Sequence, residues 1–218
     1  MRHGMFIVLF FLCTKCLGQS TQSYDSLISK MCQTLGANKN ETDTVKLKLI
    51  ATQHLWPYLE KFDTAKAHEI SNDIFVRAQR QCKDFGEIIF RLIPKKSDWE
   101  RVDKKPISHL VKSVCRDFQK LKNYSYLETN GDTAHITIED GFWIDHFNDS
   151  TFSKLKMQWL SDCEFQIEFV SSNNQIRKRL SKPGDKYRYQ VLEKSDGYYF
   201  MSAEVVGVNQ FMTFKLYY

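Results

Sequence analysis

Residues 155–169, which read LKMQWLSDCEFQIEF, decide the fold assignment. Leu155, Met157 and Trp159 alternate with polar residues, and after the turn residue Asp162 the alternation resumes from Cys163. An apolar residue at every second position is typical of a strand with one face in a core. Two such runs joined by a short turn predict an antiparallel hairpin.

The same period continues on both sides of this hairpin. From residue 124 onward, short alternating runs are separated by turn signals that include Asn130-Gly131, Asp140-Gly141, Pro183-Gly184-Asp185 and Asp196-Gly197. The pattern predicts seven or eight antiparallel strands in a meander. Because a sheet of this size must protect its edges, we expect a curled sheet or a small barrel.

The N-terminal half has a helical period. Its clearest segment is expected to be one helix from the cap residue Asp63 to Leu92. Arg77 and Arg80 fall on the opposite, polar face of this amphipathic helix, which we expect to pack on neighbouring elements. The apolar face of this helix consists of Ile70, Ile74, Ala78, Cys82, Phe85, Ile89 and Leu92.

The change of period divides the chain. We predict an α+β protein with a helical domain over residues 19–95 and an antiparallel β domain over residues 120–218. Residues 96–119 are polar at their start and are expected to form the linker or transition between them.

Residues 1–18 resemble a secretory signal peptide. Arg2 precedes an apolar run at Met5–Leu12, and Gly18 offers a small residue before the expected cleavage site. The run is shorter than the roughly 20 residues that a membrane span needs, so no transmembrane segment is expected after cleavage. Neither Cys13 nor Cys16 follows a small residue, which argues against lipid anchoring. We therefore expect a free periplasmic or secreted protein.

Four cysteines remain in the expected mature chain, and an even number in an exported protein favours two disulfides. Four cysteines allow three pairings. Because each pair would then lie within one predicted domain, we expect Cys32–Cys82 and Cys115–Cys163. The alternative is that the bridges cross the linker and join the two domains.

The β-rich half also resembles a small domain of exported, uncharacterised Bacteroidota proteins, many of them lipoproteins. The resemblance covers about residues 110–218 and rests mainly on Trp159–Phe165, together with Cys115–Phe118 and Pro183-Gly184-Asp185. The helical half, with Cys32 and Gln79–Cys82, is similar to another uncharacterised exported module. Neither resemblance implies a catalytic residue or a cofactor.

One basic cluster is a candidate binding site. Arg177, Lys178, Arg179 and Lys182 lie close together in the sequence. In an exported chain such a patch points to an anionic envelope polysaccharide or lipid rather than to nucleic acid; a solvated loop is the simpler interpretation. Without Arg2 and Lys15 of the leader, basic and acidic residues are nearly balanced, so bulk charge implies no polyanionic partner.

A second cluster combines acids with histidine. It comprises Glu139, Asp140, Asp145, His146 and Asp149. On a strand, however, Asp145 and His146 point to opposite faces, and acids at a turn are ordinary. We therefore predict no catalytic site, no metal and no cofactor here.

The sequence accordingly favours an exported, non-catalytic binding or envelope-associated protein, whose partners are a polysaccharide, a lipid or another exported protein. One alternative is a hydrolytic enzyme of an unrecognised type. The other is a carrier of a small lipid or sugar, if the β domain closes around a cavity.

Overall fold

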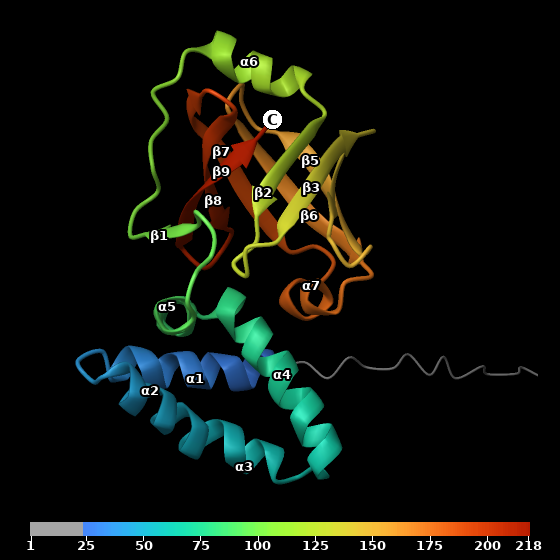
Figure 1. The fold of residues 1–218 in the computed structure, drawn as a ribbon. Coiled ribbons are helices and arrows are strands. Elements are labelled where there is room, and N and C mark those ends of the chain that lie inside the picture. The colour runs from blue at the N-terminus through green and yellow to red at the C-terminus, as the bar shows by residue number, and fades with distance from the viewer. Residues whose placement is uncertain (1–23) are drawn as a thin grey trace, which may run out of the picture.

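The computed structural model describes residues 24–218, so the predicted signal peptide and its cleavage site lie outside the described residues. Helices occupy the N-terminal half and an antiparallel β-barrel follows, as the sequence predicts (Figure 1). None of the described helices is long and apolar enough to cross a membrane.

The helical half begins with α1 (Asp25–Ala37) and α2 (Asp43–Ile50), which continues through a π-helical turn (Ala51–Leu55) into α3 (Trp56–Leu59). The long α4 (Thr64–Gln81) and α5 (Lys83–Leu92) complete it. These helices share a core that is separate from the core of the barrel. Its buried residues are Ile28, Met31, Leu35, Ile50, Ile70, Ile74, Ala78, Cys82, Phe85, Ile88 and Ile89.

The helix predicted from Asp63 to Leu92 is in fact two helices. Asp63 caps the first, because its side chain accepts a hydrogen bond from the Lys66 amide at 2.9 Å. The chain then becomes extended at Cys82 (φ −121°, ψ 105°) and changes direction into α5. Gly86 permits the close packing that results: a Cβ atom there would lie 2.8 Å from the carbonyl oxygen of Gln79. The apolar period continues across this break because both helices face the same core.

The barrel is an eight-stranded meander, and a ninth strand is added at its side. Neighbouring strands pair antiparallel throughout, and the barrel closes where β9 pairs with both β8 and β2. The barrel strands are β2 (Asn123–Leu127), β3 (Thr133–Glu139), β4 (Phe142–His146), β5 (Phe152–Trp159), β6 (Glu164–Ser172), β7 (Lys186–Ser195), β8 (Tyr198–Val205) and β9 (Gln210–Tyr217).

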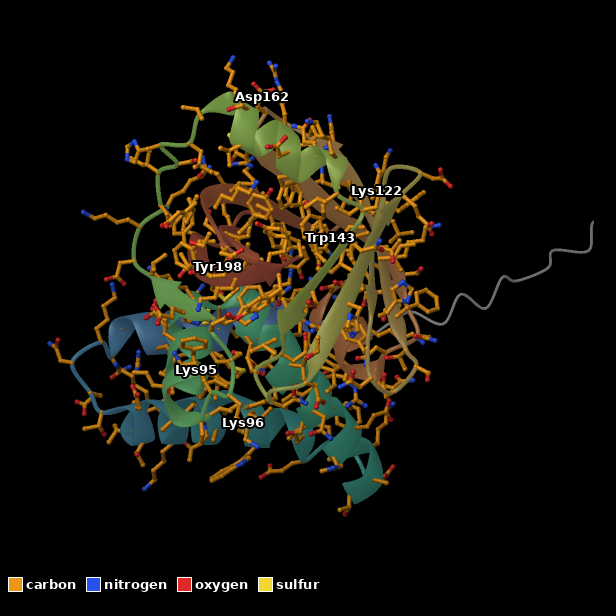
Figure 2. All side chains as sticks on the ribbon, turned by 45° about the horizontal axis from the view of Figure 1, so that its top comes forward. Lys95, Lys96, Lys122, Trp143, Asp162 and Tyr198 are labelled. Carbon is orange, nitrogen blue, oxygen red and sulfur yellow. A yellow bond between two sulfur atoms is a disulfide. The ribbon has the colours of Figure 1, made fainter. Side chains whose placement is uncertain are left out.

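Helix α6 (Lys112–Lys120) lies across one end of the barrel (Figure 1). It inserts Phe118, which is fully buried and stacks on Tyr124 with ring centroids 4.8 Å apart. Tyr199 meets the same ring edge-on at 5.0 Å. Figure 2 shows Asp162 at this end and Trp143 inside the barrel. The α6 end is therefore filled with packed side chains.

Residues 96–119, expected as a linker, are packed against the barrel. The short β1 (Glu100–Val102) pairs with β9. Trp99 stacks on Phe214 with ring centroids 4.0 Å apart, and its Nε1–H donates to the carbonyl oxygen of Leu127 at 2.8 Å. The polar composition of this segment reflects its exposed outer side, while its aromatic residue extends the barrel core.

Each half contains one disulfide. Cys32 is joined to Cys82 and Cys115 to Cys163, which are the two pairs expected from the sequence. The first bridge ties α1 to the junction of α4 and α5. The second ties α6 to the start of β6 and so holds the helix over the end of the barrel.

Candidate functional site

The opposite end of the barrel contains a cavity of about 460 Å³. It extends from the barrel interior to the helical half, and α4 and the short α7 (Gln175–Leu180) lie over it (Figure 1). Its walls are mainly apolar and aromatic, because inward-facing positions of seven barrel strands meet there. The aromatic lining residues include Trp99, Tyr126, Trp143, Phe169, Tyr187, Tyr189 and Phe214.

A carboxylate lies within this aromatic wall. Asp145 is only 8% exposed, and its Oδ1 accepts a hydrogen bond from the Trp143 Nε1–H at 2.9 Å. The hydroxyl of Tyr126 also hydrogen-bonds to this carboxylate. Burial raises the pKa of Asp145 to about 6; the nearby Glu128 acts in the same direction, whereas Arg177 and the two hydrogen bonds oppose the rise.

The mouth of the cavity is crossed by an ion pair. The Arg177 guanidinium on α7 pairs with the Glu128 carboxylate just after β2 and lies 5.0 Å from the centre of the Phe147 ring. Burial by itself would lower the pKa of Arg177, but the negative groups around it, including Glu128 and Asp145, raise it overall. Arg177 is therefore charged at every physiological pH and holds α7 against the strands.

The helical half is fixed to this end of the barrel by a buried charge cluster. Arg77 and Arg80 of α4 are 6% and 8% exposed, and both pair with Asp185. Arg77 also donates to the carbonyl oxygen of Leu180 at 2.9 Å, and Arg80 donates to the Tyr187 hydroxyl at 3.1 Å. The polar face of α4 therefore covers the barrel, and its two arginines are buried there.

The four residues predicted as a basic patch are Arg177, Lys178, Arg179 and Lys182. The structure places them on and after α7, but acidic partners occupy three of them. Arg177 pairs with Glu128, Arg179 with Asp73 at 2.8 Å and Lys182 with Asp25 at 3.5 Å. These side chains tie α7 to its surroundings, and Lys178 is exposed.

The cluster of acids and histidine does not come together. Asp145 is buried and His146 is exposed, so the two lie on opposite faces of β4, as expected. Glu139 and Asp140 lie at the β3–β4 turn, and Asp149 accepts hydrogen bonds from Thr151 in the β4–β5 turn. Among the described residues, no group of three or more His, Cys, Asp or Glu side chains is placed to hold a metal ion.

Sequence analysis named Asp145 and Arg177 in two separate clusters and did not bring them together into one site. Tyr126 and Glu128 are separated from Asp145 by the whole of β3, and no motif links them. One signal was available: Asp145 occupies an inward position in the alternation Trp143-Ile144-Asp145, where an apolar residue is the rule.

We compared the chain with protein-family models, with curated proteins and with solved structures. None of them matches it. Functional inference therefore rests on the cavity and its lining.

Proposed function

We propose that this protein binds a small, mostly apolar ligand inside its barrel. The observation that supports the proposal is the aromatic cavity of about 460 Å³ beside α7. Ligand sites are typically concave, largely apolar spaces of roughly 300–1,000 Å³ with a few polar groups that orient the ligand. Here the polar groups are Asp145, Glu128 and Arg177.

The cavity favours binding over hydrolysis. The described residues that line it include no histidine and no cysteine, the usual partners of a nucleophile or general base. The Asp145 carboxylate is instead held by Trp143 and Tyr126. The cavity also supports the alternative considered in the sequence analysis, in which the protein carries a small molecule.

We also propose that the protein works outside the cytoplasm. Two disulfides support this proposal, because such bonds persist mainly in oxidising compartments. Binding of an envelope polysaccharide or of a second exported protein stays a prediction from the sequence.

The test is to fill the cavity. Ala203 is 4% exposed, lines the cavity and lies opposite Tyr189 in the sheet. Ala203→Phe places a ring in the proposed ligand space, whereas Lys156→Phe adds the same ring on the exposed outer face of β5. We expect calorimetric titration with 2-(1-naphthyl)ethanol to show at least about a tenfold loss of affinity in the first variant and none in the second.

Near-ultraviolet circular dichroism establishes that each variant is folded, and Ala203→Leu provides a smaller obstruction if the Phe variant is not. Unchanged affinity in a folded cavity-filling variant contradicts the proposal, as does the absence of binding to the unmodified protein.

A further inference from the structure

Asp145 is an acidic residue of the cavity lining for which no ion pair forms among the described residues. Asp145 and Glu128 are acidic, and Arg177 is the basic residue beside them. Arg177 already pairs with Glu128. Asp145 receives hydrogen bonds from Trp143 and Tyr126 but forms no ion pair among the described residues. A buried carboxylate ordinarily has a cationic partner, and Asp145 lacks one among these residues.

The other basic residues of the cavity are held elsewhere. Arg80 pairs with Asp185. Arg101 lies over the Phe90 ring on the side of the helical half and donates to Gln210 Oε1 at 3.2 Å. Neither supplies the missing charge to Asp145.

The walls around Asp145 are suited to a cation. Trp143 and Tyr189 stack with ring centroids 5.8 Å apart, and Tyr126 reaches the same carboxylate from β2. The faces of aromatic rings are negatively polarised and attract ammonium groups, most strongly where water is excluded. The Trp143 Nε1–H and the Tyr126 hydroxyl point at the carboxylate, so these two rings present their edges to it. The cavity therefore combines a buried counter-charge with an aromatic lining that can attract a cation.

We infer that the ligand of this cavity is a small aromatic or aliphatic amine, whose ammonium group pairs with Asp145 inside the aromatic lining. This inference deepens the proposed function and rests on it. The apolar body of the ligand occupies the rest of the aromatic space, and the Arg177–Glu128 pair lies at the mouth behind it.

The protonation of Asp145 agrees with this geometry. Its carboxyl faces Tyr126 from β2, Glu128 just after β2, Trp143 from its own strand, Tyr189 from β7 and Arg177 from α7. The pKa is raised because burial outweighs the one nearby cation. An ammonium group beside Asp145 favours its ionised form, so amine binding releases a proton when it starts from the neutral acid. Affinity for an amine should therefore rise between pH 5 and pH 7.

Three probes of similar shape test the inference. They are 2-(1-naphthyl)ethylamine, 2-(1-naphthyl)ethanol and 3-(1-naphthyl)propionate, which are cationic, neutral and anionic at neutral pH. We expect calorimetry at pH 7.5 to show the amine binding at least about tenfold more tightly than the alcohol, and the carboxylate binding most weakly. The preference for the amine should shrink at pH 5.

Asp145→Asn keeps the size of the side chain and removes its charge. This variant should bind the amine no more tightly than the alcohol. The control is Asp149→Asn, which removes an exposed carboxylate from the β4–β5 turn and should leave the preference intact.

The outcomes separate the two proposals. If the alcohol binds and the amine binds no better, the inference is wrong and the proposed function stands. Tighter binding of the carboxylate would assign recognition to Arg177 and would also refute the inference. If none of the probes binds, both proposals fail.

Discussion

The two ends of the barrel are closed in different ways. At the α6 end, Phe118 fills the interior and the Cys115–Cys163 disulfide fixes the helix above it. At the α7 end, the Arg177–Glu128 ion pair and the buried pairs of Arg77 and Arg80 with Asp185 lie over a cavity. Packed apolar contacts and a covalent bond stabilise the barrel, whereas a charged contact over an aromatic space can open without disrupting the core. Under the proposed function, the packed α6 end stabilises the barrel and the α7 end admits the ligand.

The largest effect is expected at the packed end. Phe118→Ala removes a fully buried ring that contacts Tyr124 and Tyr199. Truncating a buried Phe typically costs about 3–5 kcal/mol of the free energy of unfolding. Urea denaturation measures the loss. Ile176→Ala on α7, where the side chain is 62% exposed, is the matched truncation at the other end and should change stability little. If both variants lost the same free energy of unfolding, the two ends of the barrel would not differ in their contribution to stability.

A pH-dependent effect is expected inside the cavity. The pKa of Asp145 is about 6 in the folded protein, against 3.8 for an unperturbed Asp, so the folded state holds this proton more tightly than the unfolded chain. The stabilisation from this group is present below about pH 4 and is lost as the pH rises to about 6; it amounts to at most about 3 kcal/mol.

Asp145→Asn should remove the loss of stability that the unmodified protein shows as the pH rises from about 4 to about 6. We expect the variant to match the unmodified protein in urea denaturation at pH 4 and to be more stable at pH 7. For Asp149 the pH dependence of stability has the opposite sign, because hydrogen bonds from Thr151 lower the pKa of its carboxyl in the folded state. A stability difference at Asp145 that does not change with pH would show that its carboxyl is not buried in the folded state.

The smallest effect on stability is expected at the mouth. Arg177→Gln breaks the pair with Glu128 and the contact with Phe147, both partly exposed, so the loss should be about 1 kcal/mol. Because this contact holds α7, hydrogen exchange of the α7 amides should accelerate. Lys178→Gln alters the exposed neighbour and should leave exchange unchanged. Equal exchange in the two variants would mean that the ion pair does not secure the helix.

The same contrast explains what the sequence could predict. Alternation in residues 155–169 predicts the hairpin, because a strand places every second residue in the core. The disulfide pairs follow from their position within each half. Turn signals and the number of strands predict a meander that curls or closes. All of these depend on local or periodic patterns.

The missed features depend on contacts between distant segments. Arg77 and Arg80 fit the polar stripe of an amphipathic helix, and only the position of Asp185 across the domain junction explains their burial. Residues 96–119 resemble a linker in the sequence. Their strand β1 forms only by pairing with β9, about a hundred residues further along the chain, and no local pattern reveals that pairing. Asp145 acquires its role only when β2, β7 and α7 meet around it.

The central claim is that ligand binds at the α7 end and not at the α6 end, and two indole groups report on these ends separately. The Trp143 Nε1–H lies in the cavity, bonded to Asp145, whereas Trp159 packs against Phe118 at the α6 end. In a nuclear magnetic resonance titration with 2-(1-naphthyl)ethanol, with the indole signals assigned by single Trp→Phe variants, we predict that the Trp143 signal shifts and the Trp159 signal stays in place. A shift of Trp159 with an unchanged Trp143 would contradict the account.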